Sequence, residues 1–232
     1  MLQGTGVSVR GPANVESQQP NQDALLVSGW RGGWIGAVAD GLGSRPLSHL
    51  GSRAACLSVR RVLRSGMAWD EPKSLVGHIY REWLRAMPIP PAQAATTLLF
   101  AACRRDGDTF VAQLGDGLVL YRAQGSIGVL TPERSGFANQ TNALGVSRSW
   151  SDWSCSRVRL SHPGDGVLMV TDGVADDLRP ECLEDFFLML AGECGRRTRR
   201  SSRKWLDSQL QAWPTPGHSD DKTIALIMRG RK

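Results

Sequence analysis

Three Asp-Gly dipeptides follow runs of apolar or small residues in this chain of 232 residues. They are Asp40-Gly41, Asp116-Gly117 and Asp172-Gly173. A further acidic pair, Asp220-Asp221, precedes the last apolar run, and Asp23 opens an early one. Carboxylates that end buried strands far apart in sequence can meet in space, where they suit hard divalent cations. The pattern therefore predicts a site for such cations.

Two cations at such a site would suit chemistry on phosphoryl groups. Magnesium and manganese prefer carboxylate and water oxygens. Two ions that share a carboxylate can lower the pKa of a water and hold the oxygens of a phosphoryl group. The glycine after each aspartate lets a cation approach the backbone carbonyl closely. The sequence contains no phosphate-loop, zinc-protease or serine-hydrolase motif that would indicate a different chemistry.

A purely structural role is the alternative for each Asp-Gly pair. Asp-Gly between two strands is typical of a hairpin turn, because both residues tolerate positive φ. Asp116-Gly117 fits that interpretation, since strands are predicted on both sides of it. Asp40-Gly41 and Asp172-Gly173 each lead from a strand towards a helix, where an aspartate could instead cap the helix. Spacing alone leaves both interpretations open.

The elements that must position these residues follow from hydrophobic periodicity and turn residues. Alternating or continuous apolar runs predict strands at 23–28, 33–39, 96–103, 109–115, 118–123, 127–130, 155–160, 166–171 and 223–228. Helical spacing predicts helices at 48–65, 73–86, 176–191 and 198–212. The four strands from 96 to 130 are joined by short turns and predict an antiparallel meander. Pairs of helices between blocks of strands predict an α+β sandwich, with two sheets face to face and helices outside.

Composition agrees with one domain spanning 1–232. The chain is 41% hydrophobic, which suffices for a sizeable core. No apolar run approaches the length of a membrane span, and we expect neither a secretory signal nor a membrane partner. The five cysteines are scattered and form no C-x-x-C pair, so a reducing cytoplasmic location is expected.

Positive charge is concentrated in one stretch of a chain whose net charge is +6. Between 195 and 204 stand Arg196, Arg197, Arg199, Arg200, Arg203 and Lys204. A nucleic-acid footprint is one interpretation. A solvated helix face is favoured over it, because no interleaved aromatic platform accompanies the charges. If the stretch binds anything, an acidic partner is preferred.

Six short motifs, in order, resemble those of a known enzyme family. Together they span nearly the whole chain and are similar to the motifs of the metal-dependent serine/threonine phosphatases of the protein phosphatase 2C family, in its bacterial branch. The motifs are Asn21-Gln22-Asp23-Ala24, Val38-Ala39-Asp40-Gly41-Leu42-Gly43-Ser44, Ala95-Thr96-Thr97-Leu98, Leu114-Gly115-Asp116-Gly117, Leu168-Met169-Val170-Thr171-Asp172-Gly173-Val174 and Asp220-Asp221-Lys222-Thr223-Ile224.

The resemblance implies a four-layer α-β-β-α sandwich with a dinuclear Mn²⁺ or Mg²⁺ centre between two antiparallel sheets. Asp40 would bridge both ions and the Gly41 carbonyl would bind the second. Asp172 and Asp220 would complete the first site. Asp220 is preferred to Asp221 because Thr223 matches the family's Thr or Ser three residues after the ligand. Asp116 and Asp176 match the ligands of a weaker third ion, and Asp23 matches the aspartate beside the second-ion ligand.

The chain departs from the family pattern at three positions. Gln22 stands where the family usually has Glu; an amide offers an oxygen without a charge, which predicts a weaker second-ion site. Gln18 stands near the place of the family's phosphate-binding arginine, for which Arg10 and Arg45 are candidate substitutes. Leu42 replaces a histidine that some relatives carry as a general acid.

The resemblance implies hydrolysis of phosphoserine and phosphothreonine in proteins by direct attack of a metal-activated water. Asp40, Asp172 and Asp220 would be essential to it, and a cognate Ser/Thr kinase is an expected partner. The alternative is a pseudophosphatase that binds phosphoproteins or a kinase without turnover. Gln22 and the absent arginine favour that alternative, whereas the three aspartates oppose it. The segment 131–153 matches a variable flap, in which Trp150 and Trp153 would contact substrate or anchor the loop.

Overall fold

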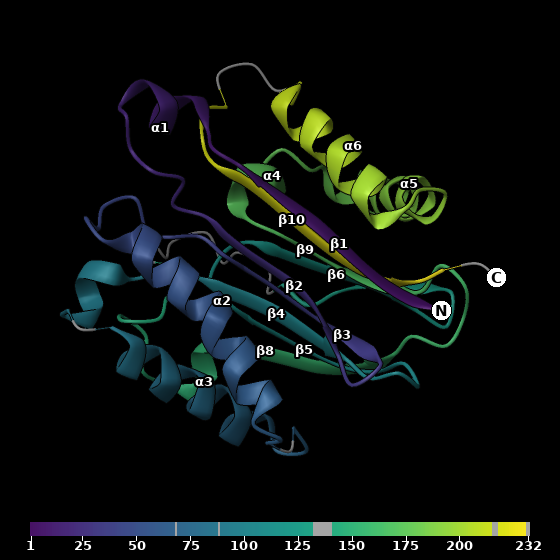
Figure 1. The fold of residues 1–232 in the computed structure, drawn as a ribbon, viewed down its shortest axis with the longest axis horizontal. Coiled ribbons are helices and arrows are strands. Elements are labelled where there is room, and N and C mark those ends of the chain that lie inside the picture. Colours follow the sequence, from purple (N-terminus) through teal and green to yellow (C-terminus); the bar gives the residue numbers. More distant parts are fainter. Residues whose placement is uncertain (68, 88, 132–140, 215–217, 231–232) are drawn as a thin grey trace.

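The computed structural model describes residues 1–67, 69–87, 89–131, 141–214 and 218–230. Two five-stranded sheets, antiparallel throughout, lie face to face with helices outside, which confirms the predicted four-layer sandwich (Figure 1). The β1 sheet contains, in spatial order, β1 (Leu2–Val9), β10 (Lys222–Arg229), β9 (Gly166–Val170), β6 (Leu118–Ala123) and β7 (Ser126–Val129). The β2 sheet contains β2 (Ala24–Trp30), β3 (Gly33–Ala39), β4 (Leu98–Cys103), β5 (Asp108–Leu114) and β8 (Ser154–Arg159).

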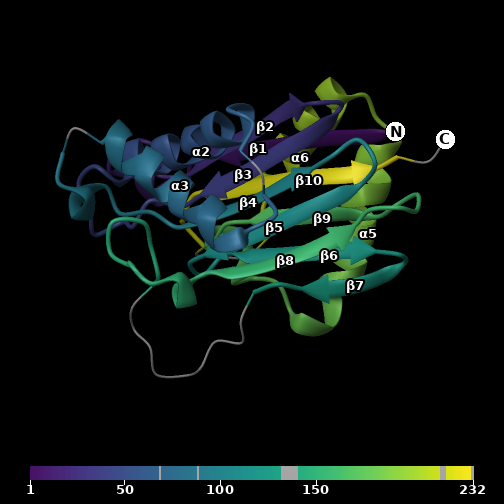
Figure 2. The same cartoon turned by 90° about the horizontal axis from the view of Figure 1, so that it is seen from below.

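One pair of long helices covers each sheet. Helices α2 (Ser48–Arg64) and α3 (Pro72–Ala86) cover the β2 sheet, and α5 (Leu183–Gly195) and α6 (Arg199–Gln211) cover the β1 sheet (Figures 1 and 2). The short helices are α1 (Pro12–Glu16), α4 (Asp172–Ala175) and the 3₁₀ turns η1 (Pro91–Ala94), η2 (Trp150–Asp152) and η3 (Pro180–Cys182). No helix among the described residues is long and apolar enough to cross a membrane.

Three layers of core explain why the central strands read as continuous apolar runs. Successive side chains of a strand point to opposite faces. In β3, Ile35 and Ala37 therefore pack under α2 and α3, whereas Val38 packs between the sheets. In β9, Leu168 packs under α5 and α6, whereas Met169 packs between the sheets. A strand buried on both faces keeps apolar residues at every position.

The predicted meander is wrong. β4 and β5 pair within the β2 sheet, but β6 pairs with β7 and β9 in the β1 sheet. Asp116-Gly117 is therefore a crossover between the sheets and not a hairpin turn. The error has a physical reason: β5 and β6 are both apolar, so nothing in their side chains distinguishes a partner in the same sheet from one in the facing sheet.

Two further differences concern the ends of elements. The expected helix at 176–191 is interrupted by η3, because Pro180 lacks the N–H that a continuing helix needs. The first strand, β1, was not predicted, since its glycine-rich sequence lacks the usual strand pattern. Gly4 is required there, because a Cβ at that position would lie 2.6 Å from the Trp34 ring of β3. The helices α2, α3 and α6 are confirmed to within one or two residues.

Candidate metal centre

The strands end in a cluster of carboxylates. Asp40 follows β3, Asp116 follows β5, and Asp172 follows β9 at the start of α4. One carboxylate oxygen from each of these three residues lies within 4.8 Å of the others. Two of the three strands belong to the β2 sheet and one to the β1 sheet. The cluster therefore lies where the two sheets meet, and side chains from all three Asp-Gly pairs come together.

Asp40 is held through its backbone by the start of β4. Its N–H donates to the Thr97 hydroxyl at 2.9 Å, and its carbonyl accepts from the Thr97 N–H and the Thr96 hydroxyl, each at 2.8 Å. These three bonds involve no carboxylate oxygen. Among the described residues the Asp40 carboxylate accepts no hydrogen bond, so both of its oxygens can serve another ligand while the backbone that carries them is fixed.

Asp172 is placed by the tight approach of two segments. Its Oδ1 accepts from the Gly173 N–H at 2.7 Å at the first turn of α4. A Cβ at Gly173 would lie 1.9 Å from the Asp221 carbonyl oxygen, so only glycine lets α4 pack against the chain entering β10. This contact brings the Asp220-Asp221 pair beside Asp172.

Asp116 is placed by a buried amide that the sequence interpretation missed. Gln113, 1% exposed on β5, donates through Nε2 to the carbonyls of Gly115 at 3.0 Å and Gly117 at 2.8 Å. Its Oε1 accepts from the Thr131 hydroxyl at 2.9 Å. Gln113 therefore shapes the crossover on which Asp116 stands, and the hydroxyl of Thr141 donates to Asp116 Oδ2 at 2.7 Å. A polar residue inside an apolar strand is the signal that could have revealed it.

The two adjacent aspartates before β10 have different environments. Asp221 is buried, and its carboxylate accepts from the backbone N–H groups of Gly11 and Gln22, each at 2.6 Å, and from Asn14 Nδ2 at 2.9 Å. Asp220 is exposed, and its charge raises the pKa of both Asp40 and Asp172. Asp220 therefore faces the carboxylate cluster, whereas Asp221 fastens the N-terminal segment to β10.

Asp23 is a buried carboxylate behind the cluster. Its Oδ2 accepts from the Thr171 hydroxyl at 2.8 Å, while Oδ1 is buried and accepts no hydrogen bond from the residues that the structure describes. Burial raises the pKa of Asp23 to about 7; the hydroxyls of Thr223 and Thr171 oppose this rise, and the charges of Asp221 and Asp172 add to it. An orphaned carboxylate oxygen of this kind is stabilised when a cation lies nearby.

The remaining predicted residues lie around this cluster. Gln22 is half-buried; its backbone carbonyl accepts from the Gly41 N–H at 3.2 Å, which ties the start of β2 to the loop after β3. The Gln22 Oε1 lies 3.5 Å from the place of a Cβ on Gly43 in that loop. Asp176 is exposed at the end of α4 and contributes the smallest of the named charge effects on Asp172.

The candidate phosphate ligands and flap residues are placed as follows. Arg10 is exposed and donates to the Gln19 carbonyl at 3.3 Å, and Arg45 is exposed in the loop between Gly41 and α2. Trp153 packs against Phe100 with ring centroids 6.5 Å apart, so it anchors the loop to the core. Trp150 is 37% exposed. Positions 132–140 of the expected flap lie outside the described residues.

The electrostatics of the cluster favour a bound cation. Burial, followed by the charges of Asp23, Asp172 and other aspartates, raises the pKa of Asp40 well above its ordinary value. Burial, followed by the charges of Asp220 and Asp116, raises the pKa of Asp172 to about 6. Carboxylates crowded in this way repel each other unless protons or cations neutralise them. An all-oxygen donor set suits Mg²⁺ or Mn²⁺, so these residues fit the ions expected from the sequence.

A comparison with models of protein families identifies the family of this chain. The model described as protein phosphatase 2C matches residues 10–211. The chain belongs to the protein phosphatase 2C family. Its members are metal-dependent serine/threonine phosphatases, and this chain contains a cluster of three carboxylates at strand ends. No curated protein matches the chain.

Several solved structures share the fold of this chain. It is similar to the photosystem II phosphatase PBCP, with 16% identity, a TM-score of 0.70 and 98% of each chain covered. It is similar to the catalytic domain of the serine/threonine phosphatase PstP, described in complex with two manganese ions, with 15% identity, a TM-score of 0.66 and 99% of each chain covered. It is also similar to PppA of Pseudomonas aeruginosa, with 18% identity, a TM-score of 0.67, and 98% of this chain and 97% of that chain covered.

Proposed function

We propose that this protein hydrolyses phosphoserine and phosphothreonine in proteins at a centre that binds Mn²⁺ or Mg²⁺. The observation that carries the proposal is the convergence of Asp40, Asp116 and Asp172, whose carboxylate oxygens lie within 4.8 Å of one another at the ends of three strands. The family match supports a phosphatase, and the donor set supports a hard cation. A kinase that phosphorylates the same proteins is the proposed counterpart.

The proposed ligands follow the family pattern. Asp40 would bind both ions and Asp172 and Asp220 the first, with the Gly41 carbonyl on the second. Gln22 and Asp23 would lie beside the second site. Asp116 and Asp176 are proposed for a weaker third ion. The closeness of Asp116 to Asp40 and Asp172 supports a third site continuous with the other two.

The chain's own residues would position substrate and charge. Bound Mn²⁺ or Mg²⁺ would supply a Lewis acid that activates water and neutralises the charge on the phosphoryl oxygens. The bonds from Thr96 and Thr97 hold the backbone of Asp40, and Gln113 holds the crossover of Asp116, so neither carboxylate has to be ordered when the ions bind. Leu42 carries no proton to donate, so solvent would protonate the leaving alkoxide.

Activity of alanine variants tests this proposal. We expect manganese-dependent hydrolysis of p-nitrophenyl phosphate and of a phosphothreonine peptide, abolished by EDTA. Asp40→Ala or Asp172→Ala should lower kcat/KM by about 1,000-fold or more, because each removes a ligand charge that no neighbour replaces. Asp185→Ala removes an exposed carboxylate of α5 and should retain full activity. Full activity of the Asp40 variant, or of the wild type in EDTA, would contradict the mechanism.

Gln22 supports the alternative that the protein is a pseudophosphatase. One variant of Gln22 distinguishes this alternative from an active phosphatase. An amide oxygen binds a divalent cation without neutralising it, so Gln22→Glu should bind Mn²⁺ about tenfold more tightly and raise activity. Gln19→Glu adds the same charge at an exposed nearby position and is the matched control. Calorimetry beside a turnover assay decides the question. If both the wild type and Gln22→Glu bind Mn²⁺ tightly and neither hydrolyses the substrates, the protein is a pseudophosphatase.

A further inference from the structure

The basic stretch 196–204 divides into neutralised and unpaired charges. Arg196 and Arg197 both form ion pairs with Glu193 on α5. Arg199 donates to the Val27 carbonyl on β2 at 3.0 Å and lies over the Trp34 ring, 5.0 Å from its centroid. These three arginines therefore have structural partners. Within the described part of the chain, Arg200, Arg203 and Lys204 form neither ion pairs nor hydrogen bonds through their side chains.

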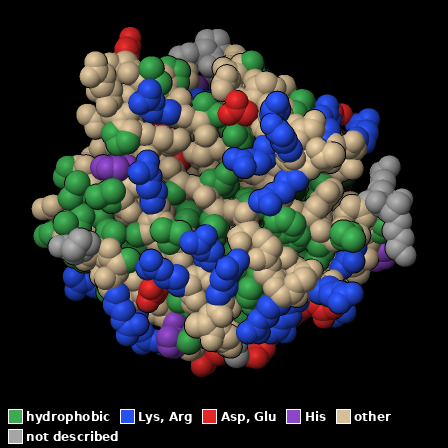
Figure 3. Space-filling model, in the orientation of Figure 1, with side chains coloured by type: hydrophobic (Ala, Val, Ile, Leu, Met, Phe, Trp, Pro, Cys, Tyr) green, Lys and Arg blue, Asp and Glu red, His purple; other side chains and the backbone are tan. Residues whose placement is uncertain are grey.

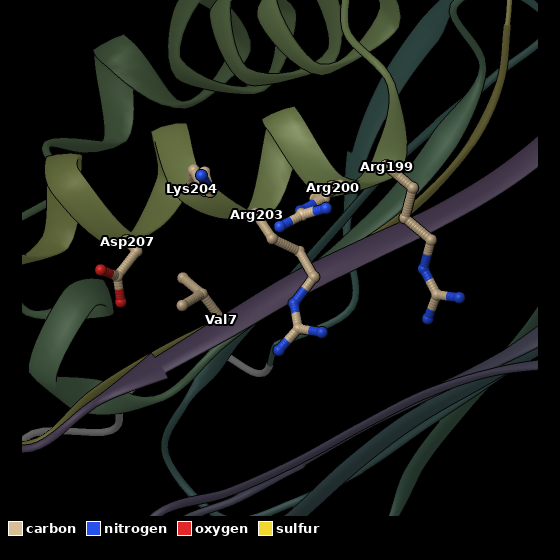
Figure 4. A pocket seen from close by; sticks show the side chains of 6 residues that line it. All are labelled: Val7, Arg199, Arg200, Arg203, Lys204 and Asp207. Atoms are coloured by element: carbon tan, nitrogen blue, oxygen red, sulfur yellow. The ribbon is translucent and has the colours of Figure 1, made fainter.

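The three unpaired cations line one cavity. A hollow of about 550 Å³ lies between α6 and β1, and its walls are Val7, Arg199, Arg200, Arg203, Lys204 and Asp207. We call it the α6 groove. Figure 4 shows that all four basic side chains come from α6, with Arg203 extending across β1. On the face shown in Figure 3, Lys and Arg side chains are more frequent than Asp and Glu side chains and are spread over the whole face.

These charges are unfavourable for the helix that carries them. Arg199, Arg200, Arg203 and Lys204 stand in the first two turns of α6, where cations oppose the helix dipole. Arg200 is three residues from Arg203 and four from Lys204, so these like charges repel one another along the helix surface. No ion pair among the described residues offsets this repulsion at Arg200, Arg203 or Lys204. An anionic partner that neutralises them would reverse this cost.

The α6 groove lies beside β1, which pairs with β10, the strand that Asp220 precedes. Val7 in the groove pairs with Ile224, four residues after Asp220. At about 3.3 Å per residue, the Val7 position lies roughly 13 Å along the strand from Asp220. An extended substrate segment four or more residues from the phosphorylated residue would therefore reach it.

We propose that the α6 groove docks an acidic protein segment that flanks the phosphorylated residue of the substrate. The proposal rests on the proposed phosphatase function and adds a substrate class to it: phosphoproteins with Asp or Glu four or more residues from the phosphosite. The lining favours a peptide over a nucleic acid. A nucleic acid would gain from stacking its bases on an aromatic ring. The nearby Trp205 is half-buried under Arg197, 5.0 Å from its ring centroid, so no base can stack on that face of it.

Binding without turnover tests the groove separately from the enzyme activity. The probe is a fluorescein-labelled, unphosphorylated peptide of alternating Glu and Gly, followed by fluorescence anisotropy. The variant Arg200→Gln/Arg203→Gln/Lys204→Gln should bind it at least about tenfold more weakly than the wild type. The control Lys73→Gln/Arg81→Gln/Arg85→Gln removes the same charge from exposed positions on α3 and should bind as the wild type does. Equal loss in both variants, or no binding by the wild type, overturns the proposal.

Turnover then connects the groove with the active site. Two phosphothreonine peptides carry either a Glu or a Gln segment, beginning four residues from the phosphate. We expect a KM about tenfold lower for the Glu peptide at similar kcat, and loss of this preference in the α6 triple variant. The variant should hydrolyse p-nitrophenyl phosphate at the wild-type rate. Binding of the acidic peptide without hydrolysis of any phosphopeptide would contradict the phosphatase function and support the groove. Hydrolysis of both phosphopeptides, with no preference for the Glu peptide and no binding of the acidic peptide, would support the phosphatase function and overturn the groove.

A nucleic acid is the competing occupant. A labelled single-stranded RNA is titrated at physiological salt against the same proteins. Weaker binding of the RNA than of the acidic peptide supports the peptide groove. Tighter binding of the RNA, lost in the α6 triple variant and retained in the α3 control, would assign the groove to nucleic acid and overturn the proposal.

Discussion

Buried carboxylates around the candidate metal centre make proton binding and cation binding compete. Asp23 shows this at a single residue, because burial raises its pKa from 3.8 to about 7 and its Oδ1 accepts no hydrogen bond from the described residues. In the metal-free protein the folded state thus holds a proton that the unfolded chain releases. The folded state gains stability from Asp23 below about pH 4, and this gain is lost as the pH rises through about 7.

We therefore predict that the metal-free protein loses stability between pH 5 and pH 8, and that Asp23→Asn reduces this loss by about 1 kcal/mol or more. Asparagine keeps the shape and can still accept from the Thr171 hydroxyl, but it carries no charge at any pH. Urea unfolding in EDTA at both pH values measures the effect. Asp185→Asn, at an exposed position, is the control and should follow the wild type. An equal pH dependence in Asp23→Asn would contradict the prediction.

Two buried carboxylates fasten opposite ends of the β1 sheet. Asp221 accepts hydrogen bonds from Gly11, Asn14 and Gln22 at the start of β10. Asp165 is fully buried at the other end, where its side chain accepts from four backbone N–H groups, those of Gln124, Gly125, Ser161 and His162. Burial alone would raise the pKa of Asp165. The four N–H groups lower the pKa by more than burial raises it, so the pKa falls below its ordinary value. Its contribution to stability is therefore fully present at pH 7.

Because Asp221 and Asp165 lie at opposite ends of the β1 sheet, we predict that their variants lose similar stability but differ in Mn²⁺ binding. Asp221→Asn and Asp165→Asn should each destabilise the protein by about 2 kcal/mol or more, because backbone donors lose a charged acceptor. Only Asp221→Asn should weaken Mn²⁺ binding, by about tenfold, since Asp221 holds Gln22 and, through it, the Gly41 N–H beside Asp40. Urea unfolding and calorimetry measure the two effects. Similar Mn²⁺ affinities of the two variants would contradict the role given to Asp221.

The sequence predicted elements better than the links between them. Helix α2 and the strands around Asp40 and Asp172 follow from local periodicity, which needs no knowledge of partners. The crossover at Asp116 and the first strand depend on contacts with distant segments, such as Val170 for Gly117 and Trp34 for Gly4. Asp165 and Asp221 act partly through hydrogen bonds to backbone groups 40 to 210 residues away in the sequence. No spacing rule identifies such long-range bonds, so these two positioning residues emerge only in the fold. Gln113 bonds to carbonyls close in sequence, and a polar residue inside an apolar strand is its signal.

At the scale of the whole molecule, the candidate metal centre joins the two sheets. Asp40 and Asp116 end strands of the β2 sheet, whereas Asp172 and Asp220 stand at ends of strands in the β1 sheet. The sheets otherwise contact each other through apolar side chains such as Val38, Leu99 and Met169. Cations bound by carboxylates from both sheets would cross-link the layers, and would also remove the repulsion that raises the pKa values of Asp40 and Asp172.

Manganese should consequently stabilise the whole fold. A ligand that binds only the folded state at about 100 times its Kd adds about 2.7 kcal/mol. For a chain of this size that gain raises Tm by roughly 5–10 °C. We predict this shift for the wild type and for Asp185→Ala in differential scanning calorimetry, and a shift below about 2 °C for Asp40→Asn, which keeps the shape of the ligand that would bind both ions but removes its charge. A full shift in Asp40→Asn would show that the stabilising cation does not depend on the Asp40 carboxylate, and would contradict the role proposed for Asp40 as the ligand that would bind both ions.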